Sequence, residues 1–215
     1  MSGRGAVPHA VPDVVPDESA APRSPSHFPL PPPSRAWGGL ALAFYAIHAG
    51  HHLLRGHPED LLWACHLGAV CVGVGLLARL PVMNAVGFLW IATGDVLWLV
   101  GLASGGEFIP TSLFTHGGGL VLGALGLARF GMPRHTWWRA MLAFLVLQQL
   151  CRFTTPPQAN VNLAHAVWSG WEEVFPSTIG YQIMLLAIGA VACFALERIS
   201  RRVLARAHYP SSSQE

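Results

Sequence analysis

The chain contains few charged residues and no lysine. Only 11% of its 215 residues are charged, and all 13 basic residues are arginines. A soluble domain carries about 25% charged residues, so this composition argues against an ordinary soluble domain and favours a membrane protein. The formal net charge of +2 is too small to indicate a nucleic-acid-binding protein. We draw no functional conclusion from the lack of lysine.

Cysteine is also scarce. The four cysteines lie in apolar segments, with neither the spacing of a zinc ribbon nor the loop setting of a secreted disulfide framework. They are Cys65, Cys71, Cys151 and Cys193. Residues 1–34 contain no apolar core, so we expect no cleavable signal peptide. Nine of the 17 prolines fall in this segment, which we predict to be a disordered, Pro-rich cytoplasmic tail.

Six apolar segments separated by short breaks follow this tail. Most are close to the ~20 residues that an α-helix needs to cross a bilayer core of about 30 Å. We therefore predict an all-α fold, a polytopic membrane bundle with its transmembrane domain at 35–200 and a basic, polar cytoplasmic tail at 201–215. The six predicted spans are 36–54, 60–80, 83–104, 110–130, 136–152 and 177–199.

The arginines indicate how the bundle is oriented. With the N-terminus in the cytoplasm, eleven arginines fall on the cytoplasmic side and only Arg55 and Arg152 fall outside. Because basic residues prefer cytoplasmic loops, we predict a multi-pass protein of the inner cell membrane with both ends inside. The long outer loop 153–176 alternates apolar and polar residues. We predict an interfacial or re-entrant segment there, either a substrate lid or an ordinary loop.

The predicted spans contain ionisable side chains at His48, His51, His52, His66, Asp95 and His116. Such groups usually face the interior of a bundle and mark a function. Counted from the ends of their spans, His48 and His66 lie about six residues, or ~9 Å, below the outer surface. His116 lies at nearly the same depth, His52 nearer the surface and Asp95 somewhat deeper. This common layer predicts one polar site in the outer leaflet. Other polar residues near the layer are His51, Gln148, Gln149, Glu107 and His165.

One chemistry open to this site is metal binding. His48 and His52 are four residues apart, so they share one face of a helix as in helical zinc sites. With His66 and His116 they would form an all-nitrogen site for zinc, iron or copper. The same histidines would also serve as axial ligands of haem.

Acyl transfer is a second possibility. His66 and His116 would then act as general acid and base, with Cys65 or a hydroxyl as nucleophile and Asp95 orienting a histidine. The hydroxyl candidates are Thr111, Ser112 and Thr115. This chemistry requires no cofactor. A third possibility is a non-catalytic transport or assembly subunit, whose histidines relay protons or only tie helices together.

Four short motifs occur in a fixed order along the chain. They are CHLG at 65–68, FTHG at 114–117, PRHTW at 133–137 and NVN at 160–162. In order and spacing, over roughly residues 60–195, they resemble the bacterial six-helix proteins of the YwaF type. These are related to the mammalian transmembrane protein 164 acyltransferases.

The resemblance implies a membrane-embedded site that uses His66 and His116, with a cysteine as acyl acceptor in the acyltransferase branch. Here the position after His-Leu is Gly68, and the nearest thiol is Cys65, three residues away on the same helix face. We therefore favour lipid acyl transfer or hydrolysis with Cys65 as nucleophile, His116 as base, His66 as acid or oxyanion donor and Asp95 orienting a histidine. Membrane lipids are the expected partners, nucleic acid is not, and a homo-oligomer or a membrane partner stays open.

Overall fold

The computed structural model describes residues 35–208, and their side chains as far as residue 206. The predicted Pro-rich tail lies outside these residues. Over 35–208 the chain forms six α-helices joined by short 3-10 and π-helical turns, without a strand. The helices are α1 (Arg35–Leu54), α2 (Ala64–Leu77), α3 (Pro81–Ala103), α4 (Gly119–Phe130), α5 (Thr136–Thr154) and α6 (Thr178–His208). The predicted all-helical fold is confirmed.

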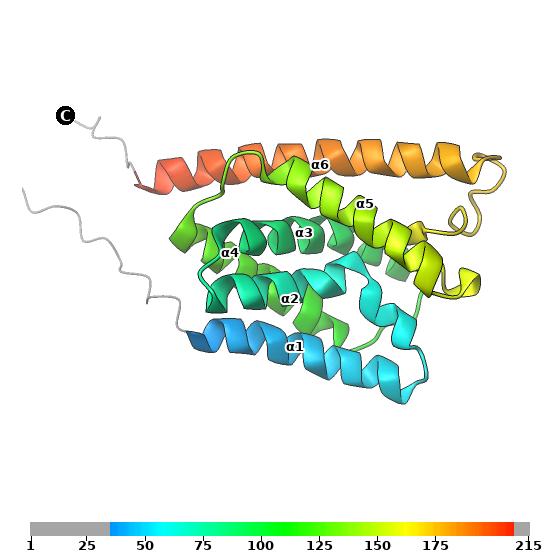
Figure 1. Ribbon diagram of the computed structural model, residues 1–215, viewed down its shortest axis with the longest axis horizontal. Helices are drawn as coiled ribbons and strands as arrows, with labels where there is room; N and C mark the ends of the chain where they lie inside the picture. The colour runs from blue at the N-terminus through cyan, green and yellow to red at the C-terminus, as the bar shows by residue number, and fades with distance from the viewer. Residues whose placement is uncertain (1–34, 209–215) are drawn as a thin grey trace, which may run out of the picture. The chain divides into compact units, whose positions relative to one another are not determined.

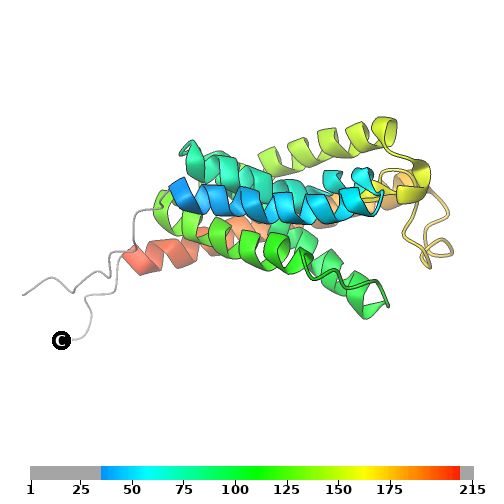
Figure 2. The same ribbon diagram turned by 90° about the horizontal axis from the view of Figure 1, so that it is seen from below.

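Consecutive helices run in opposite directions along a common axis (Figures 1 and 2). Helix α2 packs between α1 and α3, and α3 also contacts α4, α5 and α6. Glycines allow the closest approach. A side chain at Gly68 of α2 would meet the Ile91 side chain and the backbone oxygen of Gly87 on α3. Small residues at a crossing let two helix backbones touch, which brings the N-terminal end of α2 close to α3.

Some helix bounds differ from the predicted spans. The second span is shorter than expected, because a 3-10 turn at Pro58–Leu62 precedes α2. Proline cannot donate a backbone hydrogen bond, and the chain turns there before the helix begins. The fourth span is divided into a π-helical turn, η2 (Phe114–Gly118), and α4. Helix α6 continues to His208, so the predicted end of the transmembrane domain at residue 200 falls inside a helix.

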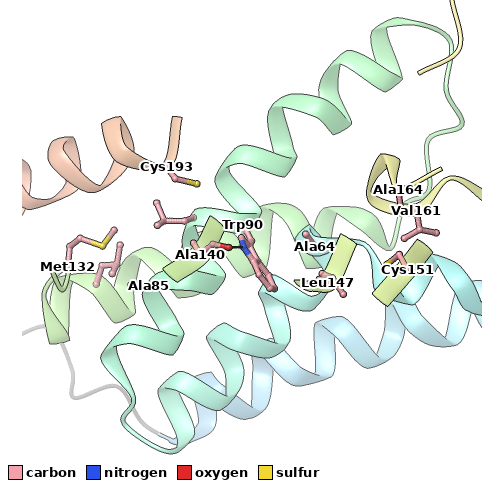
Figure 3. Packing of buried hydrophobic residues seen from close by; sticks show 12 residues of the cluster. Ala64, Ala85, Trp90, Met132, Ala140, Leu147, Cys151, Val161, Ala164 and Cys193 are labelled. Atoms are coloured by element: carbon pink, nitrogen blue, oxygen red, sulfur yellow. Dashed lines mark hydrogen bonds between the residues drawn. The ribbon is translucent and has the colours of Figure 1, made fainter. Parts of the chain in front are cut away.

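A cluster of buried side chains includes residues of α3, α5 and α6 (Figure 3). Trp90 of α3 donates its indole N–H to the backbone oxygen of Ala140 on α5, at 3.0 Å. On α6, the buried Glu197 accepts the backbone N–H groups of His135 and Trp137 at 2.9 Å. A carboxylate at a helix N-terminus satisfies free N–H groups, so Glu197 fixes the start of α5 against α6.

The loop between α5 and α6 folds back onto the bundle. Asn162 accepts the free backbone N–H of Ala64 at the start of α2, at 2.9 Å, and donates to the backbone oxygen of Leu62 at 2.8 Å. The side chains of Gln148 and Gln182 donate to backbone oxygens of the same loop. Side-chain hydrogen bonds on three sides hold the loop against the N-terminal end of α2. Gln148 therefore has a structural role.

Two of the described helices are long and apolar enough to cross a membrane, by length and composition. They are Pro81–Ala103 and the segment Thr178–Arg206 of α6. Only 28% and 17% of their most apolar windows are buried inside the protein, so most of that apolar surface faces outward. Large exposed side chains on α6 include Ile183, Ile188 and Val191.

Candidate functional site

Three histidine rings meet between α1 and α2. The Nε2 atom of His48 lies 3.1 Å from Nε2 of His66 and 3.2 Å from Nε2 of His52. All three side chains are buried. Residues four apart on a helix lie on one face, which explains why His48 and His52 of α1 point together. The sharp turn at 55–63 returns the chain so that His66, in the first turn of α2, faces them.

Each of these rings also has a hydrogen-bonding partner at its other nitrogen, Nδ1, on the side away from the cluster. The Nδ1 atom of His52 lies 3.1 Å from the carboxylate of Asp60. The Nδ1 atom of His66 lies 2.8 Å from the backbone oxygen of the same Asp60. The Nδ1 atom of His48 lies 2.9 Å from the hydroxyl of Thr111. Histidines that bind metals are oriented in this way by carboxylates, backbone carbonyls and hydroxyl groups behind the ring.

These partners fix which nitrogen carries the proton. A carbonyl oxygen and a carboxylate only accept, so His66 and His52 each donate from Nδ1, and each neutral ring presents a lone pair at Nε2. Both lone pairs point at Nε2 of His48. A proton on Nε2 of His48 can form a good hydrogen bond with only one of the two neighbouring rings, whereas a cation can accept lone pairs from all three rings. The three rings are thus a group that could hold a metal ion.

Two of the three separations between these nitrogens suit one tetrahedral ion, and the third pair lies within 4.8 Å. Two imidazole nitrogens bound to zinc at 2.0–2.1 Å with a tetrahedral angle lie about 3.3 Å apart. The observed separations of 3.1 and 3.2 Å are close to this value. The three nitrogens converge, so no two of them are placed on opposite faces of one haem ring, as ligation by two histidines requires.

A fourth histidine lies beside the trio. His116 belongs to the π-helical turn η2 and is buried. Its Nδ1 atom contacts the carboxylate of Asp95 on α3. Its ring stacks on Trp98, with centroids 4.7 Å apart, and its centroid lies 5.7 Å from that of His66. Single π-helical turns often occur at functional sites, because they shift a side chain relative to the regular helix.

Cys65 lies next to these two histidines. Its Sγ atom and a ring nitrogen of each of His66 and His116 lie within 4.8 Å of one another. The arrangement Cys65, His116 and Asp95 places a thiol, an imidazole and a carboxylate in sequence, which is the order of a nucleophile, its base and an orienting acid. Gly68, where the resembled family has cysteine, lies in the contact with α3 and does not line the cavity described next.

A cavity of about 740 Å³ opens beside the histidines. His48, His52, His66 and His116 form part of its wall, and the remaining wall is mostly apolar and comes from α3, α5 and α6. Small-molecule sites commonly measure ~300–1,000 Å³ and combine an apolar wall with a few converging polar groups. The histidine cluster is therefore accessible from a cavity of ligand size.

An ion pair lies at the polar end of this cavity. Glu107, in the loop after α3, lines the cavity and binds Arg55, which follows α1. The hydrogen bond from Arg55 lowers the pKa of the exposed Glu107 carboxyl, and the same bond raises the pKa of the guanidinium. The pair connects the end of α1, which carries His48 and His52, to the end of α3, which lines the cavity.

The structure brings the six predicted site residues together, but not all of the predicted hydroxyls. Ser112 donates its hydroxyl to the backbone oxygen of Ile109, and Thr115 donates to that of Phe44. Both hydroxyls are therefore already hydrogen-bonded to the backbone. Thr111 supports His48 instead of reacting. His165 and Gln149 do not line the cavity. His51 has a buried Nε2 without a partner, outside the trio.

Sequence reasoning missed two residues of the site. They are Asp60, the first residue of one predicted span, and Trp98, which lies inside another. Asp60 lies six residues before His66 at a break rich in proline and acid groups. A carboxylate this close to a histidine pair was a signal for a supporting ligand.

No family model, curated protein or solved structure matches the chain.

Proposed function

We propose that the chain is a six-span protein of the inner cell membrane that binds a zinc ion through His48, His52 and His66. The bound ion would activate water for hydrolysis of an acyl lipid at the outer leaflet. Both chain ends would lie in the cytoplasm, as the arginines indicate.

The exposed surface supports a place in the membrane. Exposed large apolar side chains occur on every α-helix of the described chain except α2, for example Ile47, Leu99, Val121, Val146 and Val191. Soluble monomers rarely expose contiguous apolar surface of this extent. In a bilayer the same side chains would contact lipid, and the buried polar groups would remain inside the bundle.

The observation that carries the zinc proposal is the convergence of three Nε2 atoms whose rings are each fixed from behind. Three histidines are the ligand set of catalytic zinc sites that keep a fourth position for water. Such a zinc ion lowers the pKa of its bound water to about 7, which makes hydroxide available at neutral pH. Imidazole also binds copper and iron, so the metal analysis described below identifies the ion.

His116 and Asp95 would support the hydrolysis. In this reaction a water oxygen bonds to the acyl carbon, the bond to the leaving alcohol or amine breaks, and one water proton moves to the leaving group. His116 lies beside His66 and is oriented by Asp95, so it is placed to carry that proton. This role uses no redox step and no further cofactor.

Metal content tests the proposal. Detergent-purified wild-type protein should contain one zinc ion per chain, as measured by inductively coupled plasma mass spectrometry. The His48→Ala and His66→Ala variants should lose this zinc. His57→Ala is the matched control, because His57 is an exposed histidine outside the trio, 3.4 Å from Glu59. Wild-type protein that binds no stoichiometric metal after supply of zinc during expression would overturn the proposal.

A second candidate is thiol-based acyl transfer, and the grouping of Cys65 with His116 favours it. The thiolate would bond to the acyl carbon, release the first alcohol and pass the acyl group to a second acceptor. Cys65→Ala should then abolish acyl exchange while zinc content stays unchanged. Hydrolysis at a zinc ion predicts the opposite, since activity would survive Cys65→Ala and disappear with the metal.

A further inference from the structure

We infer that the cavity between α3, α5 and α6 holds the hydrocarbon chain of a single-chain acyl amphiphile, with its ester or amide group at the histidine cluster. This names the substrate class of the proposed function and rests on it.

The cavity is polar at one end and apolar along the rest. His48, His52, His66 and His116 lie at the polar end, with Cys65 beside them. The wall supplied by α6 is apolar, as are the side chains that α5 contributes, Met141 and Phe144. A ligand that satisfies both parts has one compact polar group joined to a long apolar portion.

The α6 wall has the length of a lipid chain. Leu185, Ile188, Ala192 and Ile199 recur at helical spacing, so they form one stripe. Residues 185–199 cover about 21 Å of helix at 1.5 Å per residue. Half of a bilayer core is about 15 Å thick, so the stripe is longer than the hydrocarbon depth of one leaflet.

Small residues leave room for the chain along this stripe. Gly189, Ala192 and Ala195 of α6 and Gly101 of α3 all line the cavity. Larger side chains at these positions would fill the space between the helices. An apolar space of this kind is a suitable environment for hydrocarbon, because transfer of methylene groups from water is favourable.

The cavity also reaches the outer face of α6. Ile188, Ala192 and Ala195 line both the cavity and a shallow depression formed only by α6 residues. In the proposed membrane orientation this face contacts lipid. An amphiphile in the bilayer could therefore enter sideways past these residues.

The charge of the lining limits the polar group of the ligand. Among the described residues Glu107 is the one acidic group on the wall, and the wall contains no arginine. The nearby guanidinium of Arg55 is already paired with Glu107, so the wall offers an anionic phosphate no unpaired guanidinium, whereas an ester or amide carbonyl needs only a metal ion or imidazole. The lining therefore favours a neutral acyl group over a phosphorylated one.

Binding of radiolabelled methyl palmitate to the purified full-length protein in detergent tests this inference. Wild-type protein should bind one molecule per chain saturably. Ala192→Trp should weaken binding at least about tenfold, because an indole would occupy the cavity. Ile183→Trp is the matched control, since Ile183 lies on the same helix, is 63% exposed and does not line the cavity.

Val96→Trp, on the opposite wall, is the second blocking variant, and monodisperse elution with retained zinc shows that each variant is folded. Equal binding by both blocking variants and the control, or no saturable binding at all, would overturn the inference. His48→Ala separates the two proposals. If it loses zinc but still binds methyl palmitate, both stand. Wild-type protein that contains zinc but does not bind methyl palmitate refutes only the lipid pocket. Wild-type protein that binds methyl palmitate but contains no zinc refutes only the metal site.

Discussion

The Nε2 atoms of His48 and His66 lie 3.1 Å apart, although the residues belong to different helices and are separated by 18 positions in the chain. His66 donates from its other nitrogen to a backbone oxygen, so its Nε2 faces His48 as a lone pair. With His52 at 3.2 Å on the other side, this contact is the geometric basis of the proposed metal site.

Asp60→Asn should lower zinc affinity about 10- to 100-fold, because residues that orient metal-binding histidines typically contribute this much. The negative charge beside Nδ1 of His52 would be lost, whereas the backbone oxygen that holds His66 is unchanged. Competition with a chromogenic chelator measures the affinity. Glu59→Gln, one residue earlier, is the control and should bind zinc as the wild type does. Equal affinities for the two variants would contradict the supporting role of Asp60.

Zinc affinity should fall steeply as the pH is lowered through the range in which histidine titrates. Imidazole binds the metal only in its neutral form, so protons compete with zinc for Nε2 of each ring. Zinc affinity should therefore rise with pH: acid releases the metal, and a return to neutral pH restores binding. Chelator competition at a series of pH values measures the slope. An affinity independent of pH would exclude histidine ligands.

His116→Gln and Asp95→Asn should reduce turnover of an acyl ester about 10²- to 10⁴-fold while zinc content stays at the wild-type level. The two residues lie beside the trio and would move a proton without holding the ion. Hydrolysis of a fluorogenic acyl ester in detergent, measured together with zinc, separates these effects. Loss of zinc together with activity in both variants would show instead that they hold the metal.

Asn162→Ala should destabilise the protein by about 1–3 kcal/mol, because it leaves the buried N–H of Ala64 without an acceptor. The loop before α6 would also lose its hydrogen bond to Leu62. Thermal unfolding in detergent measures the change. Gln158→Ala, at an exposed position of the same loop, is the control and should unfold at the wild-type temperature. A wild-type unfolding temperature for Asn162→Ala would contradict this account of the loop.

Much of the site could be predicted from helical spacing and topology. The four-residue interval between His48 and His52, and their depth relative to His66 and His116, placed all four rings in one layer. The role of Asp60 could not be predicted, since it depends on the 3-10 turn that directs its carboxylate to His52 and its backbone oxygen to His66.

The helix ends were less predictable for the same reason. Hydropathy marks apolar segments, but it does not show where a backbone changes from one helix type to another. The π-helical turn that carries His116 and the late start of α2 are both such changes. The continuation of α6 through its arginines follows because arginine is a good helix former, so charge alone does not end a helix.

X-ray absorption at the zinc edge of the purified protein tests the central claim most directly. We predict a four-coordinate ion with three imidazole nitrogens and one oxygen at about 2.0–2.1 Å. The His66→Ala variant should lose one nitrogen ligand or all of the zinc. A six-coordinate, all-oxygen spectrum, or a spectrum unchanged in His66→Ala, would show that the histidine trio does not bind the metal.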